Sequence, residues 1–110
     1  GGIVKKVFIS QPMRGRSKNE IMNARDEAIE YVKEYAGEEI EVIDSYFESP
    51  PEGGCSALWY LGKSLQLMST ADIAYFAEGW EKARGCNIEF TCALNYGIKM
   101  IVKKNFKEAE

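Results

Sequence analysis

The chain has 110 residues, of which 45% are hydrophobic and 28% charged, and this composition is typical of one globular domain. Its net charge of −3 argues against a general affinity for nucleic-acid backbone, which requires a basic face. The absence of histidine excludes Ser/His and Cys/His nucleophile pairs and the commonest zinc ligand. Any catalysis must then rest on carboxylates, tyrosine, lysine or arginine.

The sequence carries no recognisable targeting segment. Its apolar runs are far shorter than the roughly 20 residues of a membrane span, and the two initial glycines look like a remnant of expression. Cys55, Cys86 and Cys92 are odd in number and lack CxxC spacing, which favours reduced thiols. We therefore expect a single domain over residues 1–110, located in the cytoplasm, with no membrane partner, metal or cofactor.

The first half of the chain predicts a strand, a loop and a helix. An apolar, β-branched stretch over 4–9 indicates the strand, and the breaker residues 10–16 indicate the loop. Ser17 followed by Glu20 is a capping box, and helical spacing of apolar residues then predicts a helix over 18–36.

The remaining elements alternate in the same way. Residues 40–43 predict a second strand, and 71–76 a buried third one. A third helix is expected over about 84–96, with Gly97 as its C-terminal cap, before a fourth strand at 100–102. The second helix is indicated by four apolar residues that share one helix face: Leu58, Leu61, Leu65 and Met68.

This element order predicts an α/β fold. Strands connected through helices run parallel, so we expect a flavodoxin-like, three-layer α/β/α domain whose four-stranded parallel sheet has the order 2-1-3-4. Such a sheet binds ligands at the carboxyl ends of the strands where the chain reverses direction. That point lies between the loop 10–17 and the loop 77–85.

The first of these loops is basic. Arg14, Gly15 and Arg16 precede a helix N-terminus, where free backbone N–H groups and the helix dipole favour a phosphate or a carboxylate. The loop matches neither GxGxxG nor the P-loop pattern. A solvated basic loop without a ligand is the alternative interpretation.

Glu89 is the lone charge in the otherwise apolar or weakly polar stretch 86–94, so its side chain is expected to be partly buried. A carboxylate held at the mouth of a ligand site is a candidate nucleophile or base. The alternative is a structural glutamate paired with Arg14 or Arg84.

Two further features have competing interpretations. An aromatic side chain near the strand ends could stack on a base, or could simply belong to the edge of the core; the candidates are Trp80, Tyr46, Phe47 and Phe8. Cys86 lies near a helix start, where a thiol pKa can be lowered. Without a histidine partner, we do not expect Cys86 to act as a nucleophile.

The chain resembles the nucleoside 2-deoxyribosyltransferase superfamily, which includes the 2′-deoxynucleoside 5′-monophosphate N-hydrolases, and more closely an uncharacterised family of small bacterial and phage domains. The resemblance covers nearly the whole chain. It is carried by Phe8-Ile9-Ser10-Gln11-Pro12-Met13-Arg14-Gly15, by Ala71-Asp72-Ile73, and by Ala77-Glu78 with Gly85, Glu89, Ala93 and Gly97.

The resemblance implies an N-glycosidase or deoxyribosyltransferase that acts on a nucleotide. Glu89 matches the glutamate that attacks the anomeric carbon, and Arg14, Gly15 and Arg16 look like the phosphate loop of the hydrolases. The other candidate substrate-binding residues are Ser10, Gln11, Pro12, Met13, Ser64, Glu78, Trp80 and Gly85.

Three positions depart from the pattern of these enzymes. Ser64 stands where they have an aspartate that helps the leaving base, Ala83 where they have aspartate or serine, and Phe8 where the hydrolases have tyrosine. Either Glu78 or Glu81 supplies the acid, or the domain is a non-catalytic nucleotide-binding or nucleotide-sensing module.

The sequence also favours self-association. Trp59, Tyr60 and Leu61 lie near the start of a helix that a small domain is expected to leave partly exposed. We therefore expect a homodimer or a larger homo-oligomer, with a small nucleotide as the ligand and no nucleic-acid partner.

Overall fold

The computed structural model describes residues 4–36, 39–44 and 52–103. The initial glycines, Tyr46, Phe47 and the end of the chain lie outside these residues. The elements, in chain order, are β1 (Lys5–Ser10), α1 (Lys18–Ala36), β2 (Ile40–Val42), α2 (Ser56–Met68), β3 (Ile73–Phe76), the 3₁₀ turn η1 (Trp80–Lys82), α3 (Arg84–Asn95) and β4 (Lys99–Val102).

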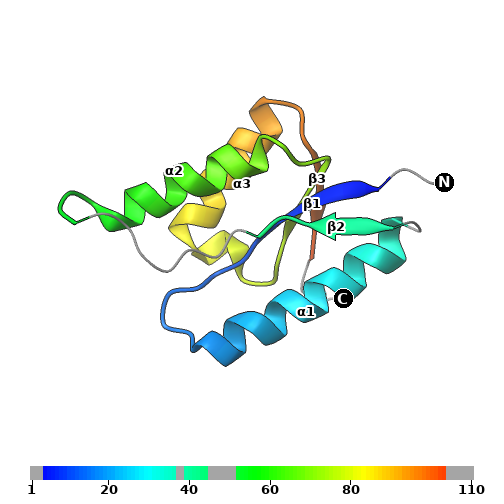
Figure 1. The fold of residues 1–110 in the computed structure, drawn as a ribbon, viewed down its shortest axis with the longest axis horizontal. Helices are drawn as coiled ribbons and strands as arrows, with labels where there is room; N and C mark the ends of the chain where they lie inside the picture. Colours follow the sequence, from blue (N-terminus) through cyan, green and yellow to red (C-terminus); the bar gives the residue numbers. More distant parts are fainter. Residues whose placement is uncertain (1–3, 37–38, 45–51, 104–110) are drawn as a thin grey trace, which may run out of the picture.

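The four strands form a parallel sheet of order β2-β1-β3-β4, which confirms the predicted topology. In the central pairs, Val7 lies opposite Ile73, and Ile73 lies opposite Lys99. Figure 1 shows α1 on one side of the sheet and α2 with α3 on the other. The molecule is therefore a three-layer α/β fold.

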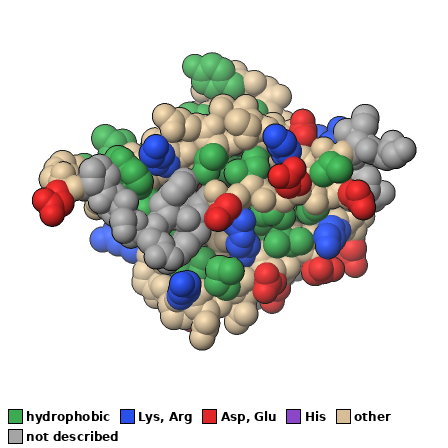
Figure 2. All heavy atoms as spheres, viewed as in Figure 1, with side chains coloured by type: hydrophobic (Ala, Val, Ile, Leu, Met, Phe, Trp, Pro, Cys, Tyr) green, Lys and Arg blue, Asp and Glu red, His purple; other side chains and the backbone are tan. Residues whose placement is uncertain are grey.

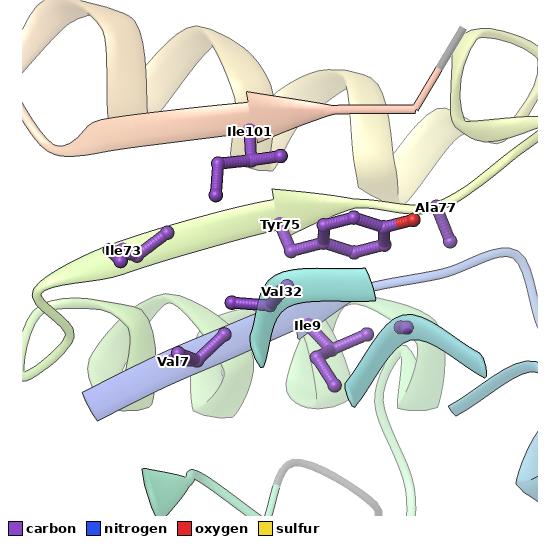
Figure 3. Close-up of a cluster of buried hydrophobic side chains, with 8 residues drawn as sticks. Val7, Ile9, Val32, Ile73, Tyr75, Ala77 and Ile101 are labelled. Atoms are coloured by element: carbon purple, nitrogen blue, oxygen red, sulfur yellow. The ribbon is translucent and has the colours of Figure 1, made fainter. Parts of the chain in front are cut away.

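The core consists of two buried clusters, one on each face of the sheet. Val7 and Ile9 point toward α1, where they pack with Val32 (Figure 3). Phe8 and Phe76 point to the opposite face, beneath α2 and α3. This division follows from the alternation of side chains along a strand, and it decides to which face each residue at the strand ends belongs.

The capping box at the start of α1 is confirmed. The backbone N–H of Ser17 donates to Glu20 Oε1 at 2.8 Å, and the backbone N–H of Glu20 donates to Ser17 Oγ at 3.1 Å. At the other end of the fold, Gly97 follows α3 with a φ of 74°, the left-handed conformation expected of its cap.

Two local predictions differ from the structure. β3 begins at Ile73 rather than at Ala71, because the backbone N–H of Ala71 still donates to the carbonyl of Met68 at the end of α2, at 3.0 Å. Leu58 is 64% exposed, although the helical spacing assigned it to the buried face. In Figure 1 the first turns of α2 extend beyond the strands, so only the later part of that helix can pack on the sheet.

No helix in the described part of the chain is long and apolar enough to cross a membrane. On the face drawn in Figure 2, basic and acidic side chains are interspersed with apolar ones. This distribution does not form a single basic patch on that face.

Candidate functional site

Glu89 lies on α3 and is buried, with 7% of its surface exposed. The hydroxyl of Ser10, the last residue of β1, donates a hydrogen bond of 2.6 Å to Glu89 Oε1. Ser64 of α2 lies near this carboxylate, and its hydroxyl lowers the carboxyl pKa. Two elements, β1 and α2, thus bring a hydroxyl group to the carboxylate of α3, and in the described residues neither Arg14 nor Arg84 pairs with it.

Burial raises the pKa of Glu89 above its ordinary value, and the hydrogen bonds from Ser10 and Ser64 partly offset that effect. Burial also raises the pKa of the neighbouring Cys86 thiol to about 11, against a hydrogen bond from Ser10 and the charge of Arg16 that lower it. Cys86 is therefore a neutral thiol at physiological pH. The thiol pKa is raised, and not lowered as the position near a helix start suggested, because desolvation is the largest effect and the charge of Glu89 adds to it.

The basic loop and the loop after β3 meet, as the switch-point argument predicted. The backbone N–H of Arg16 donates to the carbonyl of Met13 at 3.1 Å, and Gly15 within this turn has a φ of 77°. A Cβ atom added to Gly79 would lie 3.5 Å from Arg16 Nη2 and from Pro12 Cγ. Gly79 itself has a φ of 89°, so this close approach occurs at a position that favours glycine.

Gln11 and Gly85 contribute to the framework of the site. Gln11 is buried, and its Nε2 donates to the carbonyl of Ile21 at 3.0 Å, which ties the first loop to α1. Gly85 is in the first turn of α3 and is half-buried. The hydrogen bond of Gln11 therefore fixes the position of the first loop relative to α1.

One face of the Trp80 ring packs against core residues. Its indole stacks on Phe90 with a centroid distance of 4.5 Å and an angle of 17°, and it lies 5.7 Å from Phe76. Phe8 is 1% exposed and belongs to the same cluster, so it cannot stack on a base. The indole Nε1 is buried and has no hydrogen-bond partner among the described residues.

A cavity of about 590 Å³ opens on the α1 face of the sheet. It is lined by Pro12, Arg14, Arg16, Ala24, Glu27, Ala28, Tyr75, Ala77, Glu78, Gly79, Lys82, Ala83 and Lys103. The predicted phosphate loop and Glu78 therefore share this cavity. Glu89, Ser10 and Ser64 do not line it, and Glu89 lies on a helix that packs against the other face.

Several residues that line the cavity were not predicted from the sequence as site residues. Lys82 and Lys103 are distant from the basic loop along the chain and carry no motif. Tyr75 is 1% exposed, and burial together with Tyr31, Glu27 and Glu78 raises its pKa to about 12, so it keeps its proton. The alternation along β3 could have identified Tyr75, because it shares the α1 face with Ile73.

Asn87 was also missed, and it explains how η1 is held. Its Nδ2 donates to the carbonyls of Glu81 at 2.7 Å and Ala83 at 2.9 Å, which anchors the turn to α3. Within the described residues, no group of three histidine, cysteine, aspartate or glutamate side chains is arranged to hold a metal ion. The site contains a buried carboxylate with the hydroxyl of Ser10 bonded to it.

Comparison with known proteins gives no match: no family model, no curated protein and no solved structure is significantly similar to this chain. The function must consequently be argued from the site itself.

Proposed function

We propose that this chain cleaves the N-glycosidic bond of a (deoxy)nucleoside 5′-monophosphate, as an N-glycosidase or a deoxyribosyltransferase with Glu89 as the nucleophile. The observation that carries the proposal is the Glu89 carboxylate, which is buried at the switch point of the sheet and oriented by the hydroxyl of Ser10 at 2.6 Å. A buried carboxylate with no cationic partner among the described residues is costly, and such groups concentrate at functional sites.

The proposed reaction has two steps. A Glu89 oxygen attacks the anomeric carbon, the bond to the base breaks, and the base departs with the electron pair and takes up a proton. Water or a second base then attacks the same carbon and releases the glutamate. In the first step Arg14 and Arg16 would hold the 5′-phosphate as charge-assisted donors.

The protonation of the leaving base is the weakest part of this machinery. Ser64 cannot act as a carboxylic acid, and its hydroxyl is engaged with Glu89. Glu78 and Glu81 are the exposed carboxylates near the loop after β3, so they are the candidate acids. The absence of general acid catalysis typically costs a factor of about 10² to 10⁴ in rate.

The second candidate is a nucleotide-binding module without turnover. One observation favours it: Arg14 and Arg16 line the cavity, whereas Glu89 does not. Ser64 and Ala83, where the resembling enzymes have acidic or polar residues, favour it as well.

The deciding experiment is incubation of the protein with a panel of nucleoside 5′-monophosphates, with released base measured by chromatography. We expect Glu89→Gln to abolish base release and to leave nucleotide affinity within about tenfold, because attack is needed only in the transition state. Glu30→Gln, the same change at an exposed position of α1, should leave release unchanged. Ser64→Asp should raise release by up to about 10² to 10⁴ if the acid is what the site lacks.

The outcomes separate the two candidates. No release from wild type or from Ser64→Asp, with nucleotide still bound, decides for the binding module. A parallel loss of binding and stability in Glu89→Gln would make the glutamate structural.

We also propose a cytoplasmic location. It is supported by the three cysteines, all of which are free thiols.

A further inference from the structure

The cavity on the α1 face has a physical origin in the fold. A helix is about 10 Å across, whereas four strands spaced about 4.8 Å apart form a wider surface. In the described part of the chain, α1 alone covers this face (Figure 1), so part of the sheet stays open beside it. The wall that α1 contributes is formed by the short side chains of Ala24 and Ala28, together with Glu27.

The floor of the cavity is apolar and aromatic. Tyr75 on β3 and Ala77 just after it belong to the buried cluster beneath α1 and also line the cavity. In Figure 3 the hydroxyl of Tyr75 points along the strand toward Ala77, at the carboxyl end of the sheet. The floor is therefore apolar, but Tyr75 is 1% exposed, so its ring belongs to the core and offers no face for stacking.

The rim of the cavity carries an excess of positive charge. Four cations from three separate segments line it: Arg14, Arg16, Lys82 and Lys103. Two carboxylates, Glu27 and Glu78, line it as well. Within residues 4–36, 39–44 and 52–103, no carboxylate oxygen lies within 4.0 Å of a nitrogen of these cations, so none of the four is neutralised by an ion pair there.

The size of the cavity indicates the size of its ligand. Its volume of about 590 Å³ lies within the range of about 300 to 1,000 Å³ that is usual for small-molecule sites, and it is far more than a bare phosphate needs. The planar guanidinium groups suit the oxygens of a phosphate, and the apolar floor suits an organic ring.

We propose that this cavity binds a phosphorylated small molecule, with the phosphate held by Arg14, Arg16, Lys82 and Lys103 and the organic part lying against the wall at Ala24. The inference rests on the proposed function in the choice of a nucleotide as the probe and in the assignment of Arg14 and Arg16 to its phosphate. Glu89 takes no part in it, because that residue lies on a helix of the opposite face.

The test is isothermal titration calorimetry at constant ionic strength with a 2′-deoxynucleoside 5′-monophosphate, the matching nucleoside and inorganic phosphate. Wild type should bind the monophosphate more tightly than either fragment. Lys82→Gln and Lys103→Gln should each weaken it by about tenfold, the usual effect of losing one charge-assisted hydrogen bond. Glu27→Gln should tighten it, because a carboxylate that repels the phosphate is removed.

A second variant tests the cavity by shape rather than by charge. Ala24→Leu places a larger side chain on the cavity wall. It should lower the affinity for the monophosphate by about tenfold or more and leave the affinity for inorganic phosphate within about twofold. Asn23→Leu, on the exposed side of the same helical turn, is the matched control and should change neither affinity.

Absence of binding to wild type would overturn the inference. So would nucleotide binding that Ala24→Leu, Lys82→Gln and Lys103→Gln leave unchanged. The proposed reaction is tested separately. If the protein binds the nucleotide in this cavity but releases no base, the binding site is supported and the glycosidase proposal is wrong. If the protein releases base but Ala24→Leu, Lys82→Gln and Lys103→Gln leave nucleotide affinity unchanged, the proposed reaction is supported and the cavity is not the binding site.

Discussion

At the scale of single residues, the Glu89 carboxyl lies in an environment unlike water, because it is buried. Its burial favours the protonated form, and the hydroxyls of Ser10 and Ser64 favour the ionised form without supplying a charge. Ser10 is therefore best described as a positioning residue, because it contacts the carboxylate rather than any reacting atom. The Cys86 thiol stays neutral in the same environment, because burial raises its pKa to about 11.

The raised pKa of Glu89 predicts how stability depends on pH. A carboxyl whose folded-state pKa is raised stabilises the fold fully below its unfolded pKa, and this contribution is lost as pH rises through the folded pKa. From about pH 4 upward, the unfolding free energy of wild type should fall relative to Glu89→Gln, by about 1.4 kcal/mol for each pH unit that separates the two pKa values. Urea denaturation of both proteins across a pH series measures this difference.

The control for this measurement is Glu30→Gln, at an exposed carboxylate on α1. Parallel pH profiles of wild type and Glu89→Gln would contradict the assignment of a buried, raised carboxyl. Under the proposed mechanism, base release should in turn rise with pH through the same transition, because the nucleophile must be ionised.

At the scale of elements, the start of α1 carries the basic loop to the cavity. The reciprocal bonds between Ser17 and Glu20 fix the first turn of the helix directly after Arg16. The fixed helix start therefore helps to position Arg14 and Arg16 at the rim of the cavity.

We expect Ser17→Ala to lower the unfolding free energy by about 1 kcal/mol, the usual cost of losing an N-cap hydroxyl. Asn19→Ala, an exposed change within the same turn, should change stability by only a few tenths of a kcal/mol in either direction. Thermal or urea unfolding measures both. Equal effects of the two variants would show that the cap contributes nothing to the fold.

At the scale of the whole molecule, both helical layers expose large apolar side chains: Met22, Tyr31 and Tyr35 on α1, and others on the layer of α2 and α3. Leu58 is 64% exposed, Leu94 59% and Tyr96 84%. A small domain rarely leaves several large apolar side chains of one layer in water unless they contact a partner. Together with Trp59, Tyr60 and Leu61, they support the prediction of a homo-oligomer.

Static light scattering at micromolar concentration should therefore give a mass above the 12.4 kDa of one chain. Leu58→Gln should shift the equilibrium toward the monomer, because it removes an exposed apolar group from α2. Tyr35→Gln changes a residue of similar exposure, 63%, on α1 and should leave the mass unchanged. A monomeric mass for wild type would overturn the prediction.

Much of this molecule was determined by its sequence alone. Periodicity, the Ser17 and Glu20 pair and the glycine after the third helix predicted the helices, the strands and the sheet order, because these depend on local backbone preferences and on the rules for parallel connections. The meeting of the two loops at the carboxyl end of the sheet followed from the same rules.

Only the tertiary structure decided how the candidate residues are grouped. Ser10 and Glu89 are separated by 79 residues along the chain, and their hydrogen bond depends on how β1 and α3 pack. The same packing directs Arg16 to a cavity shared with Lys82 and Lys103, on the face that α1 leaves partly open. Side-chain distances across layers are set by the packing of whole elements, and no local pattern in the sequence encodes them.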